Sequence, residues 1–198
     1  HSPDIFARDG YLAGSDEQRL RQLRDAIDDP SIDAILCARG GFGATRLLPD
    51  LDLSRIAAAN KLIVGFSDIT ALHALWRNAG VPSVHAPMVA ALGRSDTGIQ
   101  SQWIDTLEHP DKPRSWHLNA FNCAGTGNAD GILTGGNLAV LGALNGTPYS
   151  PDLDGSILFI EDVGERPYRI DRILTTFSQS GWFDRINGLV IGAFTEGD

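Results

Sequence analysis

The sequence is poor in cysteine and in positive charge, and it has no long apolar run. Its two cysteines among 198 residues are too few for a disulfide framework and lack metal-ligand spacing. Sixteen Lys and Arg stand against 25 Asp and Glu, a net charge of −9, which argues against nucleic-acid and anionic-membrane partners. No stretch approaches the roughly 20 apolar residues of a membrane span. Cys37, inside the apolar run 34–38, should be a buried, unreactive thiol.

What the sequence does have is an alternation of short apolar runs and helical patterns. Apolar content is 42% and charged content 21%, as in ordinary globular proteins. The first half predicts strands at 34–38, 60–64 and 81–85, with helices at 15–28 and 69–78. Such an order favours a parallel sheet with helices on both faces and a site beyond the carboxyl ends of the strands.

The pattern weakens between 93 and 128, where Pro and Gly interrupt it, and then returns. Strands are predicted at 131–137, 156–161 and 189–194, with helices at 138–144 and 170–180. We expect an α/β protein with a Rossmann- or flavodoxin-like domain over 1–98, a connector over 99–128 and a smaller α/β domain over 129–198.

Two loops of the first half carry candidate chemistry. The run Gly65-Phe66-Ser67-Asp68 ends a strand and opens a helix, which is the pattern of a nucleophile elbow. Ser67 is then the nucleophile, and the Asp68 N–H is the first oxyanion donor. A second donor would come from Gly40 or Gly41 in the glycine loop. The alternatives are a helix-capping serine and a plain tight turn; no Gly-Lys-Ser/Thr follows the glycines, so a phosphate loop is disfavoured.

The acid and the base of such a site are less evident. Glu161 follows the apolar run 157–160, so a buried strand would deliver it to the site, although a solvated acidic loop fits as well. Arg169 could bind a substrate carboxylate or pair with a nearby acid. Of the histidines, His73 fits a packed helix position and His85 a hydrogen-bonded structural role, and none of the five meets the needs of a base.

Several motifs in one order resemble the LD-carboxypeptidases, serine peptidases that include the microcin-immunity peptidases. They are Ala38-Arg39-Gly40-Gly41-Phe42-Gly43, Gly65-Phe66-Ser67-Asp68-Ile69-Thr70, His85-Ala86-Pro87-Met88, Leu133-Thr134-Gly135-Gly136-Asn137-Leu138, Gly146-Thr147-Pro148-Tyr149, Leu158-Phe159-Ile160-Glu161-Asp162 and Pro167-Tyr168-Arg169-Ile170-Asp171-Arg172. The resemblance implies a Ser–Glu–His triad with Ser67 and Glu161, and an oxyanion hole at Asp68 and at Gly40 or Gly41. Asn137 and Arg169 are candidate substrate-binding residues. The implied histidine would lie beyond Asp198, and we expect both ends of the family sequence to be missing here.

The resemblance also implies an activity. It is the hydrolysis of the bond between an L-centre and the terminal D-alanine of murein tetrapeptides, in cytoplasmic cell-wall recycling, by a homodimer without metal or cofactor. A second family branch cleaves an aminoacyl-adenylate-like antibiotic; the compact interval from Ser67 to Glu161 disfavours it. A non-catalytic peptide-binding module and a nucleotide-binding domain remain as alternatives from other functional classes.

Overall fold

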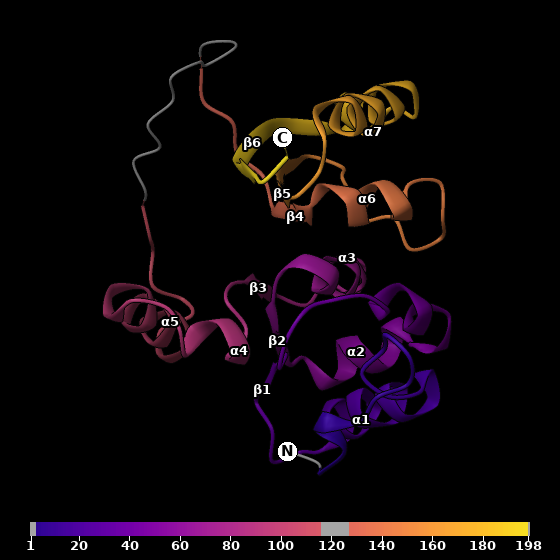
Figure 1. The fold of residues 1–198 in the computed structure, drawn as a ribbon. Coiled ribbons are helices and arrows are strands. Elements are labelled where there is room, and N and C mark those ends of the chain that lie inside the picture. The colour runs from indigo at the N-terminus through magenta and orange to yellow at the C-terminus, as the bar shows by residue number, and fades with distance from the viewer. Residues whose placement is uncertain (1–2, 116–126, 198) are drawn as a thin grey trace.

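The computed structural model describes residues 3–115 and 127–197, which we call the N-terminal and C-terminal parts. Strands and helices alternate in both, as predicted (Figure 1). The N-terminal part comprises η1 (Pro3–Phe6), α1 (Asp16–Asp28), β1 (Ala34–Leu36), η2 (Ala44–Asp50), α2 (Leu53–Ala59), β2 (Leu62–Gly65), η3 (Ser67–Ile69), α3 (Thr70–Asn78), β3 (Ser83–His85), α4 (Val89–Leu92) and α5 (Thr97–Glu108), where η marks 3₁₀ turns.

The strands of the N-terminal part form a parallel sheet in the order β1-β2-β3. Helices lie on both of its faces, α1 to α3 on one and α4 and α5 on the other (Figure 1). The sheet contributes Ile63 and Val64 to the core, and α3 contributes Trp76, all at most 1% exposed. The indole N–H of Trp76 donates to the carbonyl of Lys61 at 2.8 Å, so the largest core side chain also satisfies its one polar group.

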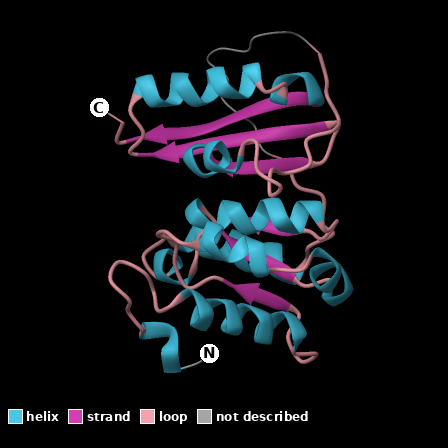
Figure 2. Ribbon diagram, turned by 90° about the vertical axis from the view of Figure 1, so that its right-hand side faces the viewer, coloured by secondary structure: helices cyan, strands magenta, loops and turns pink. Residues whose placement is uncertain are grey.

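The C-terminal part comprises β4 (Leu133–Asn137), α6 (Leu138–Leu144), β5 (Ser156–Val163), α7 (Pro167–Gln179), α8 (Trp182–Arg185) and β6 (Ile186–Thr195). Its strands form a second parallel sheet, in the order β4-β5-β6 (Figure 2). Residues of β5 alternate between buried and more exposed, because successive side chains point to opposite faces. The described helices α6 and α7 lie on one face of this sheet (Figure 1).

Local sequence accounts for where several helices begin. Ser15 caps α1, its hydroxyl accepting from the Gln18 N–H at 3.2 Å, as its spacing to Gln18 predicts. α7 starts at Pro167, three residues before the predicted start, because proline fits the first helical position, where its missing N–H costs nothing. The last strand is likewise longer than predicted, from Ile186 to Thr195.

The segment predicted as a connector contains a regular helix, α5 (Thr97–Glu108). Its apolar positions are sparse, but Asp96 caps it by accepting from the Ile99 N–H at 3.0 Å. Trp103 fixes the helix to the N-terminal part, its indole N–H donating to the Pro87 carbonyl at 2.9 Å. Cys123, His1 and His117 lie outside the described residues, and the proposed domain boundaries remain a prediction. Among residues 3–115 and 127–197, no helix is both long and apolar enough to cross a membrane.

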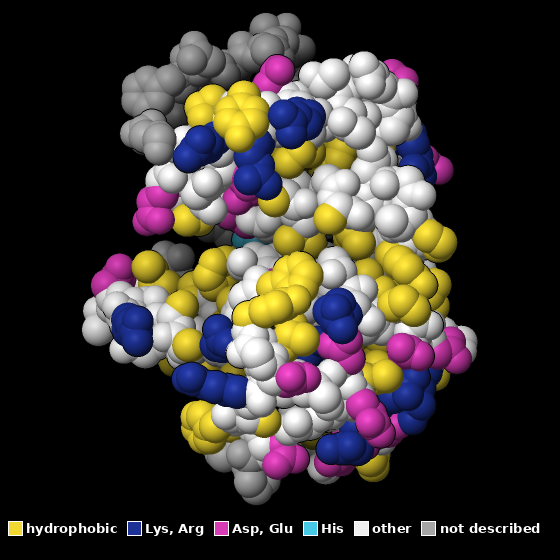
Figure 3. Space-filling model, turned by 45° about the vertical axis from the view of Figure 1, so that its right-hand side comes forward, with side chains coloured by type: hydrophobic (Ala, Val, Ile, Leu, Met, Phe, Trp, Pro, Cys, Tyr) yellow, Lys and Arg dark blue, Asp and Glu magenta, His cyan; other side chains and the backbone are white. Residues whose placement is uncertain are grey.

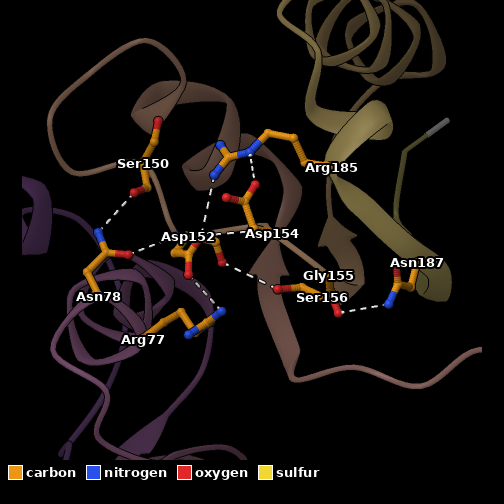
Figure 4. Close-up of polar contacts among 9 residues, drawn as sticks. All are labelled: Arg77, Asn78, Ser150, Asp152, Asp154, Gly155, Ser156, Arg185 and Asn187. Carbon is orange, nitrogen blue, oxygen red and sulfur yellow. Dashed lines mark hydrogen bonds and ion pairs between the residues drawn. The ribbon is translucent and has the colours of Figure 1, made fainter.

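The two parts contact each other along a seam at which α3 is the central element. The core cluster of the N-terminal part includes Leu144 from α6, so apolar packing crosses the seam. Polar contacts close one end of it (Figure 4). The Asn78 side chain donates to the Ser150 carbonyl at 2.9 Å and accepts from the Asp152 N–H at 2.7 Å. Arg77 adds an ion pair with the Asp152 carboxylate at 2.9 Å, so the last turn of α3 is held to the loop before β5.

Candidate active site

Ser67 lies in a strained turn between β2 and α3. Its φ is +61°, a left-handed conformation that non-glycine residues adopt rarely and at an energetic cost. Gly65, at the end of β2, makes this turn possible, since a Cβ there would lie 2.9 Å from two side-chain carbons of Ile69. A serine held at positive φ between a strand and a helix is the geometry expected of a nucleophile elbow.

The glycine loop after β1 approaches this serine. A Cβ placed on Gly40 would lie 3.3 Å from the Ser67 Cβ and 3.5 Å from its Oγ, and 3.1 Å from Met88 Cε. The missing side chain therefore lets the loop backbone come close to the hydroxyl. Gly41 differs, because the nearest atom to a Cβ there is the Arg39 Nη1 at 3.6 Å. Of the two glycines named as oxyanion donors, Gly40 is the one that adjoins Ser67.

The Asp68 side chain has a structural task. It is 8% exposed, and its Oδ2 accepts from the Ala44 N–H at 2.9 Å, which ties the serine turn to η2. Burial raises the pKa of Asp68, and hydrogen bonds from the Ala44 and Gly43 N–H groups oppose that rise. The carboxylate is thus used in a structural hydrogen bond. The backbone N–H is the group of Asp68 that remains as a candidate oxyanion donor.

Two adjacent carboxylates of β5 point to opposite faces of their sheet. Asp162 is 3% exposed, and its Oδ2 accepts from the Ala139 N–H at 2.9 Å, at the start of α6. Glu161 faces the other way, with a side chain 13% exposed and an Oε1 that is buried without a hydrogen-bond partner among the described residues. Burial raises the pKa of Glu161, and the charge of Asp162 adds to this. Glu161 is therefore a partly buried carboxyl with one oxygen, Oε1, that has no hydrogen-bond partner among the described residues.

His85 approaches Glu161 from the N-terminal part. Its Nε2 lies 3.9 Å from Glu161 Oε1, and its ring makes edge contacts with Phe66 and Phe159, at centroid distances of 6.2 and 5.2 Å. We expected a hydrogen-bonded structural role, but the ring makes no hydrogen bond with a residue of the described ranges. Only the strand-end position of His85 signalled its place at the site.

The elbow and the acid meet where β4 ends. The η3 turn that begins at Ser67 lies beside β4, and the Asn137 N–H at the end of β4 donates to Thr70 Oγ1 at 2.9 Å. Glu161 is the register partner of Asn137 in the sheet. The structure thus brings the elements that carry Ser67 and Glu161 to one place on the seam. Figure 3 shows this seam as a hollow with a histidine side chain at its bottom.

The two candidate substrate-binding residues are already engaged. Asn137 is 9% exposed, and its Oδ1 caps α6 by accepting from the Val140 N–H at 3.1 Å. Arg169 pairs with Glu165, with 3.0 Å between Nε and Oε2, and its side chain is 55% exposed. Asn137 therefore lies at the site with its Oδ1 used in capping. Of the two roles that we considered for Arg169, binding a substrate carboxylate and pairing with a nearby acid, the structure shows the ion pair.

Neutral histidines at the seam predict a loss of stability in acid. Burial and the nearby His73 lower the pKa of His85 from 6.5 to about 4, and burial lowers the pKa of His73 as well. Between pH 6.5 and 4 these histidines are protonated in the unfolded chain but stay neutral in the folded chain. Their contribution to the free energy of unfolding is therefore complete above pH 6.5 and is lost as the pH falls toward 4. For His85 the loss should be about 3 kcal/mol, measurable by urea unfolding at a series of pH values.

The raised pKa of Glu161 has the opposite effect, because it favours the folded state as the pH falls. A substitution is therefore needed to separate the contribution of His85 to the pH dependence of stability. His85→Gln should flatten the acid slope, whereas the same replacement at His109, whose side chain is 59% exposed, should leave it as in the parent protein. An unchanged slope in His85→Gln would contradict this assignment.

The chain has relatives whose reaction is named. Residues 1–86 match the family model described as LD-carboxypeptidase N-terminal domain, and residues 130–198 match that of the LD-carboxypeptidase C-terminal domain. A putative carboxypeptidase of Streptomyces coelicolor is 42% identical, covering 94% of this chain and 61% of its own length. The murein tetrapeptide carboxypeptidase of Pseudomonas aeruginosa is 36% identical, covering 97% and 66%.

A solved structure and a further relative extend the comparison. The crystal structure of muramoyltetrapeptide carboxypeptidase from Oxalobacter formigenes aligns with a TM-score of 0.84 at 35% identity, covering 96% of this chain and 66% of that one. The microcin C7 self-immunity protein of Escherichia coli is 30% identical, covering 93% and 62%. The chain spans about three fifths of the length of the curated relatives it matches. On the two matching family models and these identities, the chain belongs to the LD-carboxypeptidase family.

Proposed function

We propose that this chain carries the nucleophile and the acid of a serine carboxypeptidase that releases the terminal D-alanine of murein tetrapeptides. The observation that supports this best is the strained Ser67, which stands beside the Gly40 backbone on a turn adjacent to β4. A capping serine needs neither the positive φ nor the close glycine loop, so both features favour a nucleophile.

The proposed chemistry uses these groups in a fixed order. Ser67 Oγ attacks the carbonyl of the scissile bond, and the N–H groups of Asp68 and Gly40 bind the oxygen that becomes negatively charged. A histidine, which the family resemblance implies, takes the serine proton and passes it to the leaving amine. Glu161, whose Oε1 lacks a partner among the described residues, orients that imidazole. Water then hydrolyses the acyl-enzyme, which regenerates Ser67.

The substrate assignment follows the relatives. Proteins named for murein peptides are 36% identical to this chain, whereas the microcin C7 self-immunity protein is 30% identical. We therefore propose murein tetrapeptide as the substrate, with an aminoacyl-adenylate-like antibiotic as the alternative, and cytoplasmic cell-wall recycling as the setting. A homodimer is proposed on the resemblance alone.

Mass spectrometry of the full-length protein's products would test the proposal. Incubation with murein tetrapeptide should yield tripeptide and free D-alanine, and an aminoacyl sulfamoyl adenosine should remain intact. Cleavage of the nucleotide compound alone would move the assignment to the immunity branch. Saturable binding of tetrapeptide without cleavage would identify a binding module.

A further inference from the structure

A groove between the two sheets has no assigned role. It has a volume of about 360 Å³, within the range of small-molecule sites. β3 and β4 form its sides, and each is the terminal strand of its sheet. Apolar side chains such as Leu133 and Phe159 line it together with Ser83. The groove thus offers an extended apolar wall between two sheet edges.

Two polar side chains of α3 line the groove with unfilled hydrogen-bonding capacity. His73 and Arg77 are four residues apart, so they share one face of the helix, and both line the cavity. Each has one buried nitrogen without a partner among the described residues, Nδ1 in His73 and Nε in Arg77. Unpartnered buried polar atoms are uncommon in folded proteins and call for a specific explanation.

The chemistry of these two nitrogens is determined by their other contacts. His73 is 6% exposed, and its Nε2 lies 2.9 Å from the Gly65 carbonyl. A carbonyl only accepts, so Nε2 carries the proton and Nδ1 of the neutral ring is an acceptor. Burial lowers the pKa of His73, in agreement with a neutral ring. Arg77 Nε is a donor, since the guanidinium has no acceptor. The residues that line the groove therefore hold one unpartnered acceptor and one unpartnered donor, the complement of a peptide unit with its N–H and C=O.

The groove adjoins the proposed acid. Phe159 and Glu161 are two residues apart on β5, so their side chains are on the same face of the sheet. His85 lines the groove and also lies 3.9 Å from Glu161. His85 thus connects the lining of the groove to Glu161.

We propose that this groove binds the backbone of the peptide substrate on the acyl side of the scissile bond. The bound peptide donates an amide N–H to His73 Nδ1 and accepts at a carbonyl from Arg77 Nε. A carboxypeptidase leaves a single residue on the departing side, so the remainder of the substrate needs a separate site, which this groove would provide. This inference rests on the proposed function, whose test is separate.

Nitrogen NMR tests the contact directly. Murein tetrapeptide is added to ¹⁵N-labelled protein carrying Ser67→Ala, so that the peptide stays intact. The side-chain resonances of His73 Nδ1 and Arg77 Nε should shift as binding saturates. If the peptide binds while both resonances stay in place, or if no binding occurs at millimolar peptide, the proposal is wrong.

A blocking variant supplies a second test. Ser83→Tyr places a phenol ring in the groove, and Gln102→Tyr adds the same ring to an exposed position of α5. Ser83→Tyr should weaken tetrapeptide binding by roughly tenfold or more, as expected for loss of a fitted subsite, and Gln102→Tyr should not. In the active protein the loss should appear in KM rather than in kcat.

The two proposals fail differently. If Ser83→Tyr binds peptide as well as Gln102→Tyr does, the groove is not a subsite, while D-alanine release that depends on Ser67 would still support the carboxypeptidase. If turnover does not depend on Ser67, the proposed function fails whatever the groove binds.

Discussion

Replacing Ser67 with alanine should lower the rate of D-alanine release by about 10⁴-fold or more, because loss of the nucleophile of a serine hydrolase leaves only binding and oxyanion stabilisation. The measurement is kcat on murein tetrapeptide with the full-length protein. Stability should change little, because alanine retains the Cβ and hence the same strain at φ +61°.

Ser15→Ala is the matched control, because Ser15 is an ordinary capping serine whose hydroxyl accepts from the Gln18 N–H. Its loss should lower the free energy of unfolding by about 1 kcal/mol and leave turnover intact. The opposite result at position 67, a stability loss of this size with turnover retained, would reduce Ser67 to a helix cap and remove it from the mechanism.

Gly136→Ala should be a damaging single-methyl addition at the seam. A Cβ on Gly136 would lie 2.5 Å from Thr70 Oγ1 and 3.3 Å from His85 Nδ1, and the φ of +140° is unfavourable for alanine. We expect a loss of about 3 kcal/mol in the free energy of unfolding from strain and overpacking together. The methyl group also pushes the end of β4 away from the serine turn. Turnover should therefore fall by about 10²-fold, as expected when reacting groups move by about 1 Å.

Gly146→Ala separates backbone strain from the clash. Gly146 also has a positive φ, +75°, but a Cβ there meets nothing within 4 Å. This control should lose about 1–2 kcal/mol from its left-handed backbone alone and keep its turnover. Equal losses of unfolding free energy in the two variants, with turnover preserved in both, would contradict close packing of Gly136 against Thr70 and His85.

Local patterns were sufficient for much of the fold. The apolar runs around Ile63 and Leu158 locate two central strands, and their alternation with helices predicts parallel pairing, which the structure confirms. Helix α5 was missed because its apolar residues are few and spread along the segment, while its strongest signal, the capping Asp96, is a single residue. The placement of the described helices α6 and α7 on one face of the second sheet could not be foreseen, since apolar runs alone do not reveal which faces are covered.

The candidate site likewise has features that the sequence predicts and features that only the structure reveals. The sequence placed Ser67 at a tight turn near the glycine loop, because both features follow from short segments at strand ends. It did not predict the approach of His85 to Glu161 or the closeness of Gly136 to Thr70. These contacts depend on how the two sheets meet, and their residues are more than 60 positions apart in the chain. The unpartnered Nδ1 of His73 is likewise visible only in three dimensions.

Helix α3 is attached to the C-terminal part near both of its ends, through Thr70 at its start and through Arg77 and Asn78 at its finish. A shift of the two parts along the helix axis by one residue, about 1.5 Å, would break both sets of contacts together. Rotation about that axis moves these anchors far less than it moves distant loops. Any opening that admits a peptide should therefore be a swivel around α3 and not a slide.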